Sequence, residues 1–154
     1  MPGLVLAGRW PDTKAVLVDG SQRRIEFLAW AVSELGWDER VEVICRRAEE
    51  LGHDPTRREQ SPLVVARGFG PPAVTAECAA PLITVGGWLV VSEPPEPGPD
   101  RWPAAVSLVG LVVGPRHRAR GFTFQALSKD AACPERYPRR TGIPAKRPLF
   151  PLGD

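Results

Sequence analysis

The chain has 154 residues, of which 43% are hydrophobic. This is enough for one domain with a proper core. It shows neither an apolar run of about 18 residues nor a signal-peptide pattern at its start, so we expect a cytoplasmic protein that spans no membrane. The net charge is only +2, but residues 116–147 carry nine Arg or Lys against two acidic residues, whereas residues 1–115 carry eleven basic and fifteen acidic ones. This polarity suggests an acidic body with one end that binds a polyanion, and nucleic acid is the polyanion that we expect.

Cysteine and histidine are sparse and scattered. Cys45, Cys78 and Cys133 are odd in number and form no CxxC pair, while His53 and His117 stand apart from each other. The spacing argues against a disulfide framework and against a zinc site. We therefore expect reduced thiols and no metal.

Strand and helix patterns alternate along the first half of the chain. Apolar runs that end at turn residues predict strands, and apolar residues recurring at helical spacing predict helices. In chain order we expect a strand at 14–18, a helix from Ser21 to Leu35 stopped by Gly36, a strand at 41–45, a helix at 48–51, a polar loop at 52–61, a strand at 63–66, and a helix to about Ile83 interrupted near Pro81.

The second half begins with a Gly86-Gly87 turn. We expect a strand at 88–91, a proline-rich connector at 94–99, a short helix at 100–107, and an antiparallel pair at 108–113 and 122–128. Nearly continuous apolar strands alternating with helices predict an α/β fold, with a largely parallel sheet covered on both faces.

Ligands of such folds bind at the carboxyl ends of the strands. Asp19, the corner at 46–49, Arg67 and Ser92-Glu93 follow predicted strands directly. Asp19 is suited to ribose hydroxyls, although an aspartate here can also cap a helix. Arg67 is suited to a carboxylate or phosphate, with a salt bridge at the sheet edge as the alternative.

The C-terminal segment is basic and rich in proline. Two cationic pairs, Arg139-Arg140 and Lys146-Arg147, flank a Gly-Ile-Pro turn, and Pro138, Pro144 and Pro148 disfavour regular structure. An extended, stiffened backbone of this kind is a good shape for contacting phosphates. Two alternatives stay open: a solvated cationic tail, or Arg139 and Arg140 paired with acidic residues of the body such as Glu49 or Glu93.

Five motifs occur in an order that resembles a known family. They are Leu17-Val18-Asp19-Gly20-Ser21-Gln22-Arg23-Arg24, Arg47-Ala48-Glu49-Glu50-Leu51, Val65-Ala66-Arg67-Gly68-Phe69, Val85-Gly86-Gly87-Trp88-Leu89 and the tail from Arg139 to Leu149. Together they resemble the glucose-inhibited division protein B family, which methylates N7 of a guanine in small-subunit (16S) ribosomal RNA. The resemblance runs over essentially the whole chain and implies a Rossmann-like class I methyltransferase fold that uses S-adenosylmethionine.

The resemblance also implies roles for particular residues. Asp19 would take the ribose of S-adenosylmethionine, Ala48 and Glu49 its adenine edge, and Arg67 its methionine end. The tail would contact small-subunit ribosomal RNA through Arg139, Arg140, Lys146 and Arg147. No catalytic side chain is assigned, because guanine N7 has an exposed lone pair and needs no general base. Phe69 is a candidate for stacking on the target base, with a core role as the alternative. The oligomeric state stays open.

The start of the chain departs from the family pattern. Family members have N-terminal helices, a first strand and a glycine-rich loop, whereas Met1-Pro2-Gly3 matches only the last residues of that loop. Either the start is assigned too far downstream or the protein is genuinely shortened. We expect residues 4–7 to be helical rather than a strand, residues 1–132 to form an incomplete methyltransferase domain, and residues 133–154 to form a tail packed on it. Weak cofactor binding and marginal stability would follow.

A second departure follows the strand at 88–91. The family commonly has Lys-Gly there, whereas this chain has Ser92-Glu93. Glu93 would remove a cation beside the substrate, or instead stabilise positive charge on the purine as the methyl group arrives. Two other functions stay open: a non-catalytic RNA-binding remnant of the family, and a methyltransferase that acts on a small molecule or a protein, against which the basic tail argues.

Overall fold

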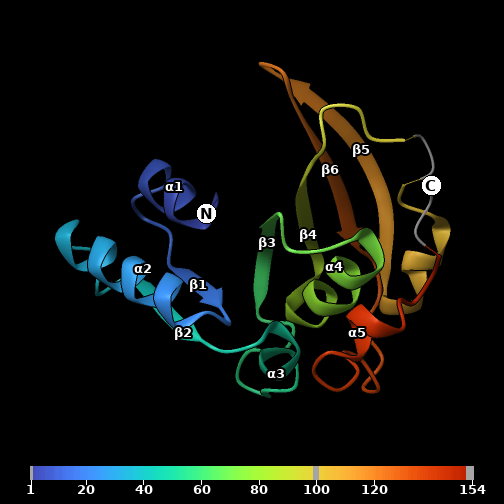
Figure 1. Ribbon diagram of the computed structural model, residues 1–154, viewed down its shortest axis with the longest axis horizontal. Coiled ribbons are helices and arrows are strands. Elements are labelled where there is room, and N and C mark those ends of the chain that lie inside the picture. The colour runs from blue at the N-terminus through green and yellow to red at the C-terminus, as the bar shows by residue number, and fades with distance from the viewer. Residues whose placement is uncertain (1, 99–100, 152–154) are drawn as a thin grey trace. The chain divides into compact units, whose positions relative to one another are not determined.

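The computed structural model describes residues 2–98 and 101–151, so the predicted role of Met1 lies outside the described residues. The chain divides into two compact units, Met1–Ala48 and Glu49–Asp154 (Figure 1). Each unit has its own sheet and its own apolar cluster. Residues 133–151 belong to the second unit, and Cys133, Tyr137 and Phe150 lie in its apolar cluster.

The first unit is a parallel two-stranded sheet with helices packed on it. Its elements in chain order are α1 Pro2–Arg9, β1 Ala15–Asp19, α2 Gln22–Glu34 and β2 Val41–Cys45. The apolar face of α2 packs Ile25, Leu28 and Val32 against Leu17 of β1, as its helical spacing predicts. The predicted helix at residues 4–7 is confirmed by α1, and the predicted strand at 41–45 by β2.

The second unit carries a mixed four-stranded sheet of order β3-β4-β6-β5. Its elements are α3 Ala48–Gly52, β3 Ser61–Arg67, α4 Pro72–Ala79, the 3₁₀-helix η1 Ala80–Leu82, β4 Ile83–Glu93, the 3₁₀-helix η2 Ala104–Val109, β5 Leu111–Ala119, β6 Phe122–Lys129 and α5 Ile143–Lys146. β3 and β4 are parallel, and β6 is antiparallel to both β4 and β5. The predicted antiparallel pair is thereby confirmed, although β5 begins and ends later than expected.

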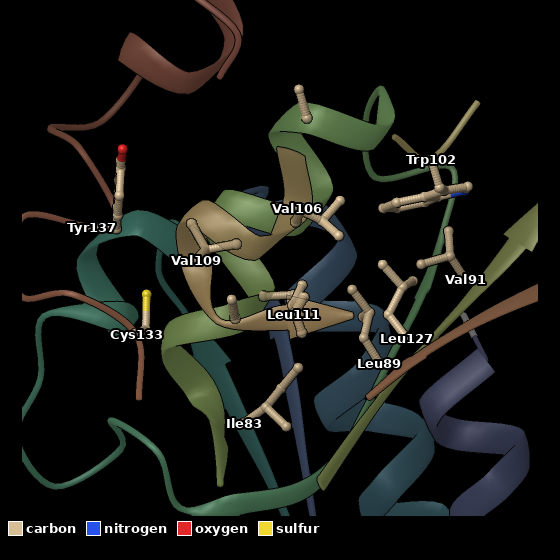
Figure 2. Close-up of a cluster of buried hydrophobic side chains, with 14 of the residues drawn as sticks. Ile83, Leu89, Val91, Trp102, Val106, Val109, Leu111, Leu127, Cys133 and Tyr137 are labelled. Carbon is tan, nitrogen blue, oxygen red and sulfur yellow. The ribbon is translucent and has the colours of Figure 1, made fainter. Parts of the chain in front are cut away.

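The core of the second unit lies on one face of this sheet. Figure 2 shows Leu89, Val91 and Leu127 of the strands facing Val106 and Val109 of η2. All eight residues of α4 are buried, and the C-terminal segment adds three further side chains to the cluster: Cys133, Tyr137 and Phe150. The tail is therefore part of the folded unit.

The opposite face of the same sheet carries an apolar row. Leu63, Trp88 and Val112 lie in one line across β3, β4 and β5, in register with Ser128 of β6. Each of the three apolar side chains is about two-fifths exposed: 39%, 42% and 44% respectively. Within the second unit, its own helices cover the face of the sheet that carries the core, not the face with this apolar row. β1 pairs with β2 alone and β3 with β4 alone among the described residues.

Three predicted elements are wrong in their details. The helix expected at 100–107 is the 3₁₀-helix η2, which starts only after Pro103. The Gly86-Gly87 pair does not precede β4 but lies inside it, because Gly86 adopts a left-handed φ of 86° without ending the strand. The tail is not extended throughout, since α5 forms one helical turn. Pro144 lies at its start, where a missing N–H does no harm.

Candidate functional site

Each unit presents the carboxyl ends of a parallel strand pair. In the first unit β1 ends at Asp19 and β2 at Cys45, and in the second unit β3 ends at Arg67 and β4 at Glu93. Three of the predicted site residues therefore lie where α/β folds bind ligands, or directly after that edge: Asp19, Ala48 and Arg67. Asp19 and Ala48 belong to the first unit, whereas Glu49 and Arg67 belong to the second.

Asp19 is held by the start of α2. Its Oδ1 accepts hydrogen bonds from the Ser21 N–H (2.8 Å) and from Arg24 Nη2 (2.8 Å), and its Oδ2 accepts one from Arg24 Nε (2.7 Å). The Arg24 hydrogen bond is the main reason that the pKa of Asp19 lies below its usual value. An ionised carboxylate offers about four acceptor positions. One position therefore remains for an outside donor such as a ribose hydroxyl.

Glu49 faces the tail within the second unit. It lies in the first turn of α3, and its Oε1 accepts a hydrogen bond from the backbone N–H of Gly142 (3.1 Å). Gly142 is the residue before α5 and has a left-handed φ of 80°, which favours glycine. The carboxylate of Glu49 thus fixes the turn that starts α5, a role that the sequence motif did not indicate.

A pocket of about 430 Å³ opens at the carboxyl ends of β3 and β4. This volume is within the usual range for small-molecule sites. Phe69 follows β3 and is 49% exposed, so it is not a core residue, while Phe122 at the start of β6 is 56% exposed. The pocket is lined by residues 67–70, 91–95, 101–102 and 121–123. Arg67, Phe69 and Glu93 thus lie around one cavity.

Glu93 forms part of the pocket wall, and both of its carboxylate oxygens have a neighbour of opposite polarity. Its Oε1 accepts a hydrogen bond from Trp102 Nε1 (2.7 Å), and its Oε2 forms an ion pair with Arg101 Nε (2.5 Å). The side chain of Glu93 is 1% exposed, whereas that of Arg101 is 33% exposed. Arg101 therefore neutralises the charge of Glu93, so the pair adds no net charge to the pocket wall.

The four predicted RNA contacts lie in two different environments. Arg139 is tied down, because its backbone N–H and its Nε each donate to Glu77 Oε1 (2.8 Å), and its Nη2 donates to Glu77 Oε2 (2.6 Å). Its Nη2 also donates to the carbonyl of Arg147 (2.6 Å). Arg140, Lys146 and Arg147 are exposed. The open question of a body partner for Arg139 is answered by Glu77, which the sequence reasoning did not consider.

Two further features bear on the kind of site. No helix among the described residues is long and apolar enough to cross a bilayer. Among residues 2–98 and 101–151, no group of three or more His, Cys, Asp or Glu side chains could hold a metal ion.

Comparisons with known proteins agree with this geometry. The ribosomal RNA small subunit methyltransferase G of Dictyoglomus thermophilum is 34% identical over 97% of this chain and 65% of its own length. That of Moorella thermoacetica is 32% identical over the same shares. The chain therefore spans about 65% of the length of these curated relatives. The crystal structure of the antibiotic-resistance methyltransferase Kmr superimposes with a TM-score of 0.65 at 13% identity, over 84% of this chain and 82% of that one. This likeness shows the class I methyltransferase fold. The family model described as GidB, rRNA small subunit methyltransferase G, matches residues 1–93, and the chain belongs to this family.

Proposed function

We propose that this protein transfers a methyl group from S-adenosylmethionine to N7 of a guanine in small-subunit ribosomal RNA. The observation that carries the proposal is the pocket at the carboxyl ends of β3 and β4, lined by Arg67 and Phe69, in a chain of this family. A ribosomal RNA substrate also fits a protein that acts in the cytoplasm.

The residues present fit part of the cofactor. Asp19 is an acceptor at the end of a parallel strand with one acceptor position left, which suits a ribose hydroxyl. Arg67 is exposed at the end of β3 and suits the carboxylate of a methionine group. We assign Ala48 and Glu49 to the adenine edge by their place after β2. When bound, the cofactor supplies an electrophilic methyl group on a sulfonium ion.

The protein's own part in the reaction is binding and orientation. Phe69 would stack on an unstacked guanine, and the pocket would exclude water around it. Because N7 carries its own lone pair, no side chain has to remove a proton before transfer. Arg101 holds the carboxylate of Glu93 in the wall, so that this anion is neutralised before the RNA phosphates approach.

A second function is favoured by the same structure. Two of the donors that engage Asp19 come from Arg24, and they compete with a ribose for its oxygens. A chain that bound RNA but no cofactor would be a non-catalytic RNA-binding member of the family.

Transfer of a labelled methyl group distinguishes the two functions. Small-subunit ribosomal RNA transcribed in vitro carries no methyl groups and serves as substrate, with tritiated S-adenosylmethionine in large excess because weak binding is expected. We expect label in the RNA, and a loss of about 1–3 kcal/mol in cofactor binding for Asp19→Asn, the scale of losing a charged acceptor. Glu26→Gln, on the exposed face of α2, is the matched control. RNA binding without label would favour the non-catalytic function.

A further inference from the structure

The hairpin formed by β5 and β6 carries positive charge and no negative charge. Residues 111–129 contain Arg116, Arg118, Arg120 and Lys129 but no Asp or Glu. Lys129 is buried, and Arg116 is tied down through Nε to Gln125 Oε1 (3.4 Å) and through Nη2 to the Gly98 carbonyl (3.2 Å). Arg118 and Arg120 are exposed. The hairpin therefore presents two arginines to solvent near its turn.

The turn itself places an arginine in an unfavourable backbone conformation. Arg120 has a φ of 50° and Gly121 a φ of 79°, so both central residues are left-handed. Hairpin turns of this kind strongly favour Asn, Asp or Gly at the first of these positions. An L-residue with a Cβ atom is disfavoured there. The fold gives no reason for arginine at this position, and such outliers cluster at functional sites.

Both arginines adjoin the pocket described above. The turn residue Gly121 and the first two residues of β6 line the pocket, and Arg118 is the cross-strand partner of Thr123, one of these residues. Phe122, more than half exposed, lines the pocket, and its cross-strand partner is Ala119, which lies between Arg118 and Arg120 in the chain. Exposed aromatic rings beside cations are typical of surfaces that bind single-stranded nucleic acid, where bases stack and phosphates pair with arginine.

The exposed cations of the tail lie elsewhere. Figure 1 shows the β5–β6 turn at one end of the second unit and α5 at the other. A nucleotide whose base enters the pocket has its neighbouring phosphates near the pocket mouth. Those phosphates are then close to the hairpin and far from Arg140 and Lys146.

We infer that Arg118 and Arg120 bind the phosphates on either side of the target guanine in single-stranded RNA, while Phe122 stacks on a neighbouring base. This inference rests on the proposed function, because it takes the pocket as the site of the target base. It adds to that function a place on the molecule where the substrate strand enters.

The test compares two double variants that change the charge equally. Binding of a short fluorescent single-stranded RNA with one guanosine is titrated at several salt concentrations with the 154-residue chain, with R118E/R120E and with R140E/K146E. We expect R118E/R120E to weaken binding at least about tenfold, the scale of lost charged hydrogen bonds. The slope of log K against log salt should fall by about 1.4, for two contacts to a single strand. The tail variant should change both much less.

A further variant separates binding from folding. Arg120→Gly relieves the left-handed residue, so it should raise the melting temperature or leave it unchanged while it weakens RNA binding. The inference would be overturned if R118E/R120E bound RNA as tightly as the unaltered chain, or if the tail variant lost as much affinity. In either case the unaltered chain would still bind RNA, and the proposed substrate would stand. If the unaltered chain bound no RNA at all, the proposed substrate would fail, and the inference with it.

Discussion

Removal of the Arg139 side chain should destabilise the second unit severely. The carboxylate of Glu77 is 0% exposed in the last turn of α4, and Arg139 donates three hydrogen bonds to its oxygens. Arg139→Ala removes two of these donors and the compensating charge, and leaves only the backbone N–H. Breaking a buried ion pair from one side costs about 3–5 kcal/mol. Small domains are stable by only about 5–15 kcal/mol, so this is a large fraction of the total.

Urea unfolding followed by tryptophan fluorescence measures this loss, since Trp102 is buried in the same unit. Arg140→Ala is the matched control. It removes the exposed cation next to Arg139 in the chain, so it should change the free energy of unfolding by no more than about 0.5 kcal/mol. Replacing both partners, with Glu77→Leu and Arg139→Met, should recover most of the loss because no charge is then buried. A loss below about 1 kcal/mol for Arg139→Ala would refute the reasoning and return Arg139 to the candidate RNA contacts.

Two further predictions concern titration and thiol reactivity. Burial favours protonation of Glu59, but the backbone N–H of Cys133 and the ammonium of Lys129 outweigh it, and they hold the pKa of Glu59 below its usual value. The stability that Glu59 contributes is therefore present at neutral pH and lost as the pH falls below about 5. Glu59→Gln should weaken this pH dependence of the free energy of unfolding. An unchanged pH profile in the variant would contradict the prediction. Cys45 is exposed, whereas burial raises the pKa of both the Cys78 and Cys133 thiols. A thiol reagent should thus modify one cysteine in the native chain and three after denaturation, and rapid native reaction of more than one would count against the described core.

Local patterns predicted the elements that are held by local contacts. The periodicity from Ser21 to Leu35 gave α2 nearly at its observed bounds, because one apolar stripe decides which face packs on β1. The run at 41–45 gave β2, and the alternation at 122–128 gave β6. Turn residues mark the ends of two of these segments: Gly20 and Gly36 flank the helix, and Gly121 precedes β6.

Contacts between distant segments could not be predicted in this way. Glu77 and Arg139 are 62 residues apart, and Glu49 and Gly142 are 93 apart. The local pattern of α4 does not mark Glu77 as buried. Glu77 is the single charged residue of an otherwise apolar or small helix, and such a charge ordinarily faces solvent. The sequence therefore left the partner of Arg139 open, with RNA phosphates, Glu49 and Glu93 as the candidates.

The pocket shows the same limit. Its residues were identified in part, because Arg67, Phe69 and Glu93 follow strands. The contribution of the β5–β6 turn was missed, since Gly121 and Phe122 reach the pocket only through the antiparallel return of β6 to β4. The pairing of Glu93 with Arg101 and Trp102 was missed because the intervening proline-rich connector gives no pattern that fixes where the chain returns.

The most direct measurement of the central claim locates the methyl group in the RNA product. After incubation with S-adenosylmethionine, the small-subunit RNA is treated with borohydride and aniline, which cleave the strand at 7-methylguanosine, and the break is mapped by primer extension. We expect cleavage at a single guanine, reduced when Phe69 or Arg67 is replaced by alanine and unchanged for the exposed control Glu26→Gln. Methylation at another atom or base, or no methylation of RNA that the chain binds, would contradict it.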